Sequence, residues 1–205
     1  MTVLFPDCVL LIFCKAPITG QVKTRLQPAL SPNQAVEAHK KLTCLTLERA
    51  FQKPLCNVQL CCTPDTNHSF FKQCATDYPL LLSTQRGADL GERMLNAFSD
   101  ALSEYRHAIL IGCDCPSLTV DDLQHALMAL QNGSDVVIAP AEDGGYVLIG
   151  LNTPQPVLFK NMVWGNGKVM EETRHRAKKS SISFYELATQ WDVDTIEDWT
   201  RYLHR

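Results

Sequence analysis

Long apolar stretches are missing from this chain of 205 residues. The longest uninterrupted apolar run, Cys8 to Cys14, has seven residues, whereas a membrane-spanning helix needs about 18 or more. Asp7 directly precedes that run and the first basic residue is Lys15, so the positively charged start of a secretory leader is absent. We therefore expect a cytoplasmic protein that has no membrane partner.

An excess of positive charge is missing as well. The chain has 19 Lys and Arg against 22 Asp and Glu, which gives a formal net charge of -3. Proteins that hold nucleic acid by its phosphates usually carry a clear basic excess, so we expect no nucleic-acid partner. Hydrophobic residues make up 45% of the chain, enough for a globular core at this length. We expect a single domain over residues 1–205.

The metal-binding spacing C-x-x-C is absent, although the chain has nine cysteines. No C-x-x-C pair occurs, and such pairs are what normally reveals a structural zinc site in a sequence. The odd number of cysteines also argues against a disulfide framework. Cys8, Cys14, Cys62 and Cys113 lie within or next to apolar runs. We therefore expect reduced, mostly buried thiols that pack as small apolar side chains.

Familiar nucleotide-binding and nucleophile motifs are absent. Neither the Walker loop G-x-x-x-x-G-K-[ST] nor the hydrolase elbow G-x-S-x-G occurs in the sequence. The six histidines are scattered, without the spacing of metal ligands and without a partnered nucleophile. Covalent catalysis by a serine or cysteine nucleophile is therefore disfavoured.

Short apolar runs and stretches of helical periodicity alternate along the chain. The strand-like runs cover Cys8–Cys14, Cys56–Cys62, Leu80–Leu82, Ala108–Ile111, Val136–Ala139 and Tyr146–Leu151. Helices are predicted after Ser31, from Asp89, after Thr119 and after Thr195, because capping residues precede these segments. Parallel strands need crossovers, which are usually helices. The alternation therefore predicts an α/β fold, a three-layer α/β/α sandwich with a mostly parallel sheet.

One connection is too short for such a crossover. Only residues 140–145 separate the strand-like runs 136–139 and 146–151, and a helix does not fit between them. A hairpin is predicted instead, which makes the sheet mixed. This hairpin places Glu142 and Asp143 in a loop at a strand end.

The first predicted strand leads into a loop with three cations, Lys15, Lys23 and Arg25. Open α/β sheets bind phosphates in the loop that follows the first strand. Arginine holds a phosphate with two hydrogen bonds, and lysine adds a mobile positive charge. The loop is therefore predicted to bind phosphate, with an ordinary solvated loop as the alternative.

Acidic residues follow other predicted strands. Asp114 comes shortly after the strand 108–111, where side chains point into the ligand crevice of such folds. Opposite a phosphate loop, a carboxylate can hold Mg²⁺ or Mn²⁺, and the alternative is that Asp114 caps the following turn. Asp143 and Asp194 lie in two further acidic segments that could reach the same crevice. A tight turn and a helix cap would explain these two equally well.

Two glycine-containing segments suit recognition of the rest of a ligand. Gln85, Gly87 and Arg93 lie around the start of the helix predicted from Asp89. An amide, an accessible backbone and a guanidinium suit a base or a ribose. Trp164 lies in W-G-N-G-K, where its indole could stack on a substrate. A plain loop and a packed aromatic side chain are the alternatives.

Five motifs occur together, in the order A-P-x-x-G-x-x-K-T-R-L, L-G-E-R-M, G-x-D-x-P-S-L, E-D-G-G-Y-x-L-I-G-L and D-V-D-T. This combination resembles a family of bacterial glycosyltransferase-like proteins, described as nucleotide-diphospho-sugar transferase-like, which includes glycosyltransferases assigned to arsenosugar biosynthesis. The resemblance extends from about Val9 to Trp199. The family is similar to GT-A glycosyltransferases and to sugar nucleotidyltransferases. The K-T-R-L loop also looks like that of 2-phospho-lactate guanylyltransferase.

The resemblance implies a GT-A-like fold and a metal-dependent transferase that uses an activated nucleotide or nucleotide sugar. Carried over by motif, it implies that Lys23 and Arg25 hold phosphates and that Asp114 binds Mg²⁺ or Mn²⁺. The other placements that it implies are the nucleotide side for Gln85 and Gly87 and the side of a small-molecule acceptor for Asp143 and Tyr146.

Two departures from the family pattern leave the reaction open. The D-x-D signature of glycosyltransferases is reduced to the single acid Asp114, and the G-x-G-x-R loop of typical sugar nucleotidyltransferases is replaced by a loop with one glycine. We expect glycosyl transfer, with Asp114 and Asp143 catalytic, Asp194 as a second metal ligand and Trp164 on the acceptor side. Nucleotidyl transfer with release of pyrophosphate and a non-catalytic nucleotide-binding regulatory protein are the alternatives.

Overall fold

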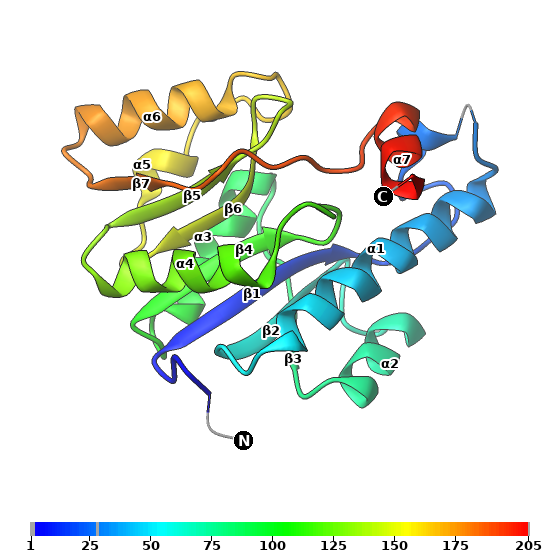
Figure 1. Ribbon diagram of the computed structural model, residues 1–205, viewed down its shortest axis with the longest axis horizontal. Helices are drawn as coiled ribbons and strands as arrows, with labels where there is room; N and C mark the ends of the chain where they lie inside the picture. Colours follow the sequence, from blue (N-terminus) through cyan, green and yellow to red (C-terminus); the bar gives the residue numbers. More distant parts are fainter. Residues whose placement is uncertain (1–2, 28, 205) are drawn as a thin grey trace.

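The computed structural model describes residues 3–27 and 29–204 of the chain. Within these residues, seven strands form one mixed sheet in the order β3-β2-β1-β4-β6-β5-β7 (Figure 1). The strands are β1 (Cys8–Lys15), β2 (Asn57–Thr63), β3 (Leu81–Thr84), β4 (His107–Gly112), β5 (Val136–Pro140), β6 (Tyr146–Leu151) and β7 (Phe184–Glu186). The first four strands are parallel neighbours, whereas β6 runs antiparallel to both β4 and β5.

Helices cover both faces of this sheet. They are α1 (Pro32–Gln52), α2 (Ser69–Asp77), α3 (Leu90–Ala101), α4 (Val120–Gln131), α5 (Pro156–Phe159), α6 (Val169–Lys179) and α7 (Ile196–Leu203), with a short 3-10 turn η1 (Thr24–Leu26). The buried side chains of α1, α2 and α4 form one core with the sheet, and those of α3, α5 and α6 form the other. The predicted three-layer α/β/α sandwich is confirmed.

The central strand β1 shows how the two cores divide. Leu10 and Ile12 belong to the core beneath α1 and α4, while Val9 and Leu11 belong to the core beneath α3 and α6. All four side chains are at most 2% exposed. Burial on both faces is typical of parallel sheets, and it explains why this strand appears in the sequence as a continuous apolar run.

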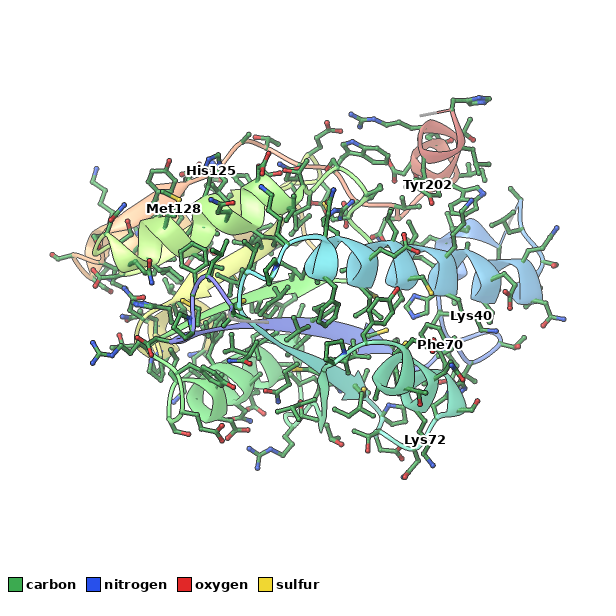
Figure 2. The ribbon with its side chains drawn as sticks, turned by 60° about the horizontal axis from the view of Figure 1, so that its bottom comes forward. Lys40, Phe70, Lys72, His125, Met128 and Tyr202 are labelled. Carbon is green, nitrogen blue, oxygen red and sulfur yellow. The ribbon has the colours of Figure 1, made fainter. Side chains whose placement is uncertain are left out.

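The last helix, α7, lies beside α1 at the end of the sheet where the chain terminates (Figures 1 and 2). The ammonium of Lys41 on α1 is 5.3 Å from the centre of the Tyr202 ring on α7. Leu26 of η1 and Leu42 of α1 are fully buried against Trp191 and Val193, which precede α7. This third cluster brings the last part of the chain next to the loop that follows β1.

The predicted helix starts are confirmed. The hydroxyl of Ser31 accepts a hydrogen bond from the backbone N–H of Gln34, and the Gln34 side chain accepts one from the backbone N–H of Ser31. The same reciprocal pairing precedes α4 and α7, and Asp89 caps α3. These side chains satisfy backbone donors that a helix start leaves free.

The predicted hairpin between β5 and β6 is also confirmed. The two strands pair antiparallel from Val136 opposite Leu151 to Pro140 opposite Tyr146. The connection between them contains Glu142 and Asp143, as expected. Because β6 also pairs with β4, this hairpin points its loop toward the carboxyl end of the central parallel strands.

Four elements of the structure were not predicted: α2, α5, α6 and β7. The strand β7 has three residues, and α5 has four, too few for a periodic pattern. The helix α6 is rich in charged residues, and it packs through Val169, Met170, Thr173 and Ala177. Tertiary contacts, rather than a local sequence pattern, define these elements.

The thiols behave as expected in the described residues. All nine cysteines are free; eight are buried and Cys44 is partly exposed. Within the same residues, no helix combines the length and the apolar character needed to cross a bilayer.

Candidate active site

Two cavities with a shared wall lie at the carboxyl ends of β1 and β4. The polar cavity has a volume of about 370 Å³, and its lining includes Lys15, Lys23, Arg25, Gln85, Arg93, Asp114 and Asp194. The apolar cavity has a volume of about 260 Å³, and its lining includes Met94, Ile149, Asp143, Tyr146 and Trp164. Phe13, Leu90 and Gly112 line both cavities. A ligand with two chemically different halves could therefore span them.

The structure brings the predicted phosphate loop and the predicted acid together in the polar cavity. All the residues predicted to bind the nucleotide or its phosphates line this cavity except Gly87, which lines neither cavity. Its carbonyl accepts a hydrogen bond of 3.1 Å from Nε of Arg93 and so orients that guanidinium. Gln85 lines the cavity, and its Nε2 donates to the Cys61 carbonyl at 2.7 Å, which leaves the amide oxygen as the group available to a ligand.

An acidic cluster forms where Asp114 meets Asp192 and Asp194. One carboxylate oxygen of each residue lies within 4.8 Å of the others. The backbone N–H of Val193 donates to the carbonyl of Asp114 at 2.9 Å, so the D-V-D-T segment lies alongside the residues that follow β4. Asp194 was expected here as a metal ligand, whereas Asp192 was expected only as part of the same acidic segment, without a role of its own.

A second set of contacts holds the D-V-D-T segment in place. The Ser117 hydroxyl donates to the Trp191 carbonyl at 3.0 Å and accepts from the Trp191 N–H at 2.9 Å. The guanidinium of Arg201 lies 4.2 Å from the centre of the Trp191 ring and pairs with Glu142 at 2.7 Å. Residues from α7, from the β5–β6 loop and from the segment after β4 thus fix the acidic cluster jointly.

Lys23 places its ammonium inside the acidic cluster. Its Nζ lies 2.8 Å from Oδ2 of Asp114, 3.5 Å from Oδ1 of Asp194 and 2.5 Å from the carbonyl oxygen of Val193. The backbone of Lys23 is left-handed, with φ 46°, a strained conformation for a residue with a side chain. Arg25 pairs with the other oxygen of Asp194 at 2.9 Å. The Lys23 ammonium therefore lies where a metal ion would contact these carboxylates.

The pKa values of this pair follow from their contact. Burial alone would raise the pKa of Asp114, but the charge and the hydrogen bond of Lys23 lower it below its ordinary value. Burial alone would lower the pKa of Lys23, but Asp114 and Asp194 raise it well above its ordinary value. Both groups are therefore charged at neutral pH.

Asp192 has no such compensation. Burial, together with the negative charges of Asp114, Asp194 and Asp143, raises the pKa of Asp192 to about 7. Lys23 and Arg25 balance Asp114 and Asp194, so ionised Asp192 leaves the cluster with one unbalanced negative charge. Above about pH 7 this charge favours a further cation.

We expect Asp192→Asn to stabilise the metal-free protein at alkaline pH and not at acidic pH. The pKa of Asp192 is about 7 in the folded chain and about 4 in the unfolded chain. The folded chain binds its proton more tightly, so stability falls as the pH rises from about 4 to about 7. Asparagine removes this penalty, which a pKa difference of about 3 puts at no more than about 4 kcal/mol. Because Asp192 is only half-buried, we expect about half of that, roughly 2 kcal/mol, or a rise in Tm of about 4–8 °C at about pH 8. Thermal melts in a chelator at about pH 4 and pH 8 test this, and an equal shift at both would contradict it.

The donor set of the acidic cluster fits a hard divalent cation. Carboxylate oxygens are the ligands that Mg²⁺ and Mn²⁺ prefer, and Asp114, Asp192 and Asp194 offer three of them within 4.8 Å of one another. The Lys23 ammonium already shows that a cation fits between Asp114 and Asp194. These three aspartates are the residues that could hold the metal.

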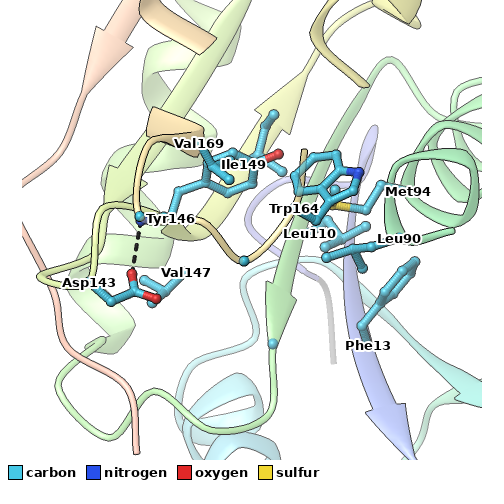
Figure 3. A pocket seen from close by; sticks show the side chains of 14 residues that line it. Phe13, Leu90, Met94, Leu110, Asp143, Tyr146, Val147, Ile149, Trp164 and Val169 are labelled. Atoms are coloured by element: carbon cyan, nitrogen blue, oxygen red, sulfur yellow. Dashed lines mark hydrogen bonds between the residues drawn. The ribbon is translucent and has the colours of Figure 1, made fainter. Parts of the chain in front are cut away.

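Tyr146 and Trp164 line the apolar cavity (Figure 3). Their rings meet edge to face, with the ring centres 6.4 Å apart and the ring planes at 85° to each other. Among the described residues, neither the Tyr146 hydroxyl nor Nε1 of Trp164 has a hydrogen-bond partner, and both atoms are buried. Burial raises the pKa of the Tyr146 hydroxyl, which therefore stays protonated. Buried donors without partners are costly. Both atoms are closed off from the open cavity, and Nε1 of Trp164 lies against Gly91 of α3. A ligand in this cavity would therefore meet mainly apolar side-chain surface.

Asp143 lies at the mouth of the apolar cavity, in the loop that joins β5 and β6 (Figure 3). Its Oδ1 accepts a hydrogen bond of 2.8 Å from the backbone N–H of Gly145, which is the tight-turn geometry that was the alternative reading. The side chain is nevertheless exposed and lines the cavity. Its charge also acts on Asp192, so Asp143 is close enough to the acidic cluster to influence it.

Gly144 fixes this loop against the segment that contains Trp164. Its φ is +86°, and a Cβ at this position would overlap the carbonyl oxygen of Gly167. We expect Gly144→Ala to lower the free energy of unfolding by about 2–4 kcal/mol, because neither backbone can move without the other. Gly133→Ala is the matched control, since its φ is +96° but no atom lies within 4 Å, so it should cost only about 1–2 kcal/mol. Equal losses in urea unfolding would contradict this account.

Comparison with solved structures identifies proteins with a similar fold. A protein from Desulfovibrio desulfuricans G20 described as a candidate nucleotide-diphospho-sugar transferase is 29% identical, with a TM-score of 0.88 over 97% of this chain and 87% of that one. CMP:2-keto-3-deoxy-manno-octonic acid synthetase complexed with CTP is 12% identical, with a TM-score of 0.60 over 95% and 96%. The 4-diphosphocytidyl-2C-methyl-D-erythritol synthase of Anaerococcus prevotii is 9% identical, with a TM-score of 0.62 over 97% and 100%. The last two similarities concern the fold alone.

The chain is a transferase-like enzyme, and its fold is similar to that of nucleotide-diphospho-sugar transferase-like proteins, as the motifs implied. Residues 46–166 match the model of the family described as "Uncharacterized protein conserved in bacteria (DUF2064)". This segment is more than half of the chain, and the chain belongs to that family. No curated protein matches the chain.

Proposed function

We propose that the protein is a metal-dependent transferase that moves a glycosyl group from a nucleotide sugar to a small-molecule acceptor. One observation carries the proposal. The acidic cluster of Asp114, Asp192 and Asp194 lies with the cations of the β1 loop at the polar cavity, and this cavity adjoins an apolar one lined by Tyr146 and Trp164. A metal-bound diphosphate and a less polar acceptor would each find a suitable half.

On the polar side, the three aspartates would hold Mg²⁺ or Mn²⁺. When bound, the ion would act as a Lewis acid that stabilises charge on the departing diphosphate. Arg25 and Lys15 are exposed at the mouth of the cavity, where both can reach phosphate oxygens. Arg93, oriented by the Gly87 carbonyl, and the free amide oxygen of Gln85 are placed to contact the nucleoside. Positioning and electrostatic stabilisation would do most of the catalytic work.

On the apolar side, Tyr146 and Trp164 would position the acceptor, and Asp143 would take its proton. The acceptor hydroxyl oxygen attacks the anomeric carbon and forms a new C–O bond there. The bond from that carbon to the diphosphate breaks, and its electron pair leaves with the nucleoside diphosphate. The hydroxyl proton passes to the Asp143 carboxylate, which is exposed and can release it to water.

The shape of the β1 loop supports glycosyl over nucleotidyl transfer. Enzymes that wrap a triphosphate use a glycine-rich loop whose backbone N–H groups point at the phosphates. Here the N–H groups of Ile18 and Gln21 already donate to carbonyls within the loop, at 2.8 and 3.0 Å. A Cβ on Gly20 would meet no atom within 4 Å. These two N–H groups are therefore not available to a phosphate. What the loop brings to the cavity is three side-chain cations, Lys15, Lys23 and Arg25, and this supports a diphosphate donor over a triphosphate.

Nucleotidyl transfer is the second candidate, because the K-T-R-L segment puts Lys23 and Arg25 close to the acidic cluster. In that reaction an acceptor phosphate oxygen attacks the α-phosphate of a nucleoside triphosphate, and the bond to pyrophosphate breaks. Lys23 and Arg25 would then neutralise the departing pyrophosphate.

We expect nucleotide sugars with Mg²⁺ or Mn²⁺ to raise Tm, by an amount equivalent to about 2.7 kcal/mol at 100 times Kd. Transfer to a panel of hydroxyl-bearing acceptors should then release nucleoside diphosphate. Triphosphates offered in parallel with phosphorylated acceptors serve as the comparison. Release of pyrophosphate alone would replace glycosyl by nucleotidyl transfer, and binding without either product would favour a regulatory protein. No shift with any nucleotide would refute both transferase readings.

A further inference from the structure

A second group of ligand-type side chains lies beside the polar cavity. Cys14 is the last residue but one of β1, His39 lies on α1 and Cys113 follows β4. Their side chains are 1%, 4% and 5% exposed. One ligand atom from each lies within 4.8 Å of the others. The roles proposed above for substrate and metal use none of the three. Within residues 3–27 and 29–204, this is the one such group that combines thiols with an imidazole.

The fold assembles this group from segments far apart in the sequence. Phe13 and Gly112 are partners in the parallel register of β1 and β4, so Cys14 and Cys113 follow as neighbours across the two strands. The Nε2–H of His39 donates to the carbonyl of Lys15 at 2.8 Å and thereby orients the ring toward Cys14. The absence of a C-x-x-C pair therefore excludes a local zinc motif but not a site built by the sheet.

The separation between the Cys14 sulfur and the His39 nitrogen is close to what a tetrahedral zinc site needs. Zinc bonds of about 2.3 Å to sulfur and 2.0–2.1 Å to nitrogen imply a sulfur-to-nitrogen separation of about 3.6 Å. Sγ of Cys14 lies 3.8 Å from Nε2 of His39. Thiolate and imidazole ligands favour zinc and other thiophilic ions over Mg²⁺, so this group and the acidic cluster would select different metals.

We propose that Cys14, His39 and Cys113 bind one thiophilic divalent cation, with Zn²⁺ as the ion tested, at the floor of the polar cavity. All three residues line that cavity, which gives the ion an entry path and leaves the fourth position for water or a ligand oxygen. Binding releases the two thiol protons to water and moves the ring proton of His39 from Nε2 to Nδ1, so that Nε2 exchanges its hydrogen bond to the Lys15 carbonyl for a bond to the metal. The ion would tie the ends of β1 and β4 to α1, directly beside Asp114.

The test is a Zn²⁺ titration of the reduced, chelator-treated full chain against a chromophoric chelator, with millimolar Mg²⁺ present to fill the carboxylate cluster. One Zn²⁺ per chain is expected. Cys14→Ser and Cys113→Ser should each weaken binding by more than the roughly 10–100-fold that loss of an outer-shell contact costs. Cys74→Ser is the matched control, because Cys74 is 4% exposed but lies outside the group, and its Zn²⁺ affinity should equal that of the parent.

A measurement on the unaltered chain keeps the proposal testable if the serine variants fail to fold. Co²⁺ bound by the reduced protein should give a sulfur-to-cobalt charge-transfer band, which carboxylate ligation cannot produce. Absence of that band, or Zn²⁺ affinity unchanged in Cys14→Ser, would overturn the proposal. So would a Cys14–Cys113 disulfide in the isolated protein that, once reduced, leaves a chain unable to bind Co²⁺, because the pair would then be a redox couple.

Discussion

Asp114→Asn is expected to abolish metal-dependent binding of the nucleotide and to reduce turnover at least about 100-fold, since a bound metal supplies several kcal/mol of transition-state stabilisation. Asparagine keeps the shape of the side chain but removes the charge that pairs with Lys23 at 2.8 Å. Asp192 and Asp194 would remain, but Lys23 would lose the shorter of its two carboxylate contacts. Mn²⁺ binding, followed by calorimetry or electron paramagnetic resonance, reports the loss directly.

Asp121→Asn is the matched control for this substitution. Asp121 also pairs with a lysine, Lys53, at 2.7 Å, but it is exposed on α4 and lies outside both cavities. Exposed pairs contribute little to stability, so this variant should bind Mn²⁺ and turn over like the parent. If Asp114→Asn retained the parent's metal affinity, Asp114 would be a turn-capping residue and the metal site would have to lie elsewhere.

The parts of the site that the sequence predicted are those that follow strand ends directly. Lys15 is the last residue of β1 and Asp114 comes shortly after β4, and parallel topology brings such ends to one edge of the sheet. Asp194 was also predicted, from the motif that precedes the last helix. These expectations needed only the order of strands and helices, which alternating apolar runs and capping residues reveal.

The parts that the sequence did not predict depend on contacts between distant segments. Asp192 joins the cluster because Trp191 is held by Ser117 and Arg201. Cys14 and Cys113 become neighbours only through the register of β1 with β4. The spacing of residues within one segment does not predict such contacts, because they form only when segments far apart in the sequence pack together.

The pairing of Lys23 with Asp114 is a further contact of this kind, and it changes the role expected for Lys23. The sequence suggested a lysine directed at phosphate, whereas the ammonium lies between Asp114 and Asp194. A metal and the Lys23 ammonium would compete for the same carboxylates. A nucleotide that arrives with its metal resolves the competition, because it supplies a cation for the aspartates and phosphates for Lys23.

We therefore expect opposite effects of Lys23→Met on the two ligands. The metal alone should bind at least about 10-fold more tightly, because the Lys23 ammonium no longer competes for the carboxylates and the acidic cluster is more negative by one charge. The nucleotide should bind more weakly, most clearly at low salt. The metal-free protein should lose about 2–3 kcal/mol of stability, less than a fully buried pair would cost, because the Asp114 side chain is 32% exposed.

Measurement of the three quantities separates this account from a merely structural role for Lys23. Mn²⁺ affinity, nucleotide affinity and urea unfolding with and without Mg²⁺ should show that the metal restores most of the stability that Lys23→Met removes. Lys53→Met, which breaks the exposed pair with Asp121, should change none of them appreciably. If Mn²⁺ instead bound more weakly to Lys23→Met than to the parent, Lys23 would organise the carboxylates rather than compete for them, and metal and nucleotide would not need to arrive together.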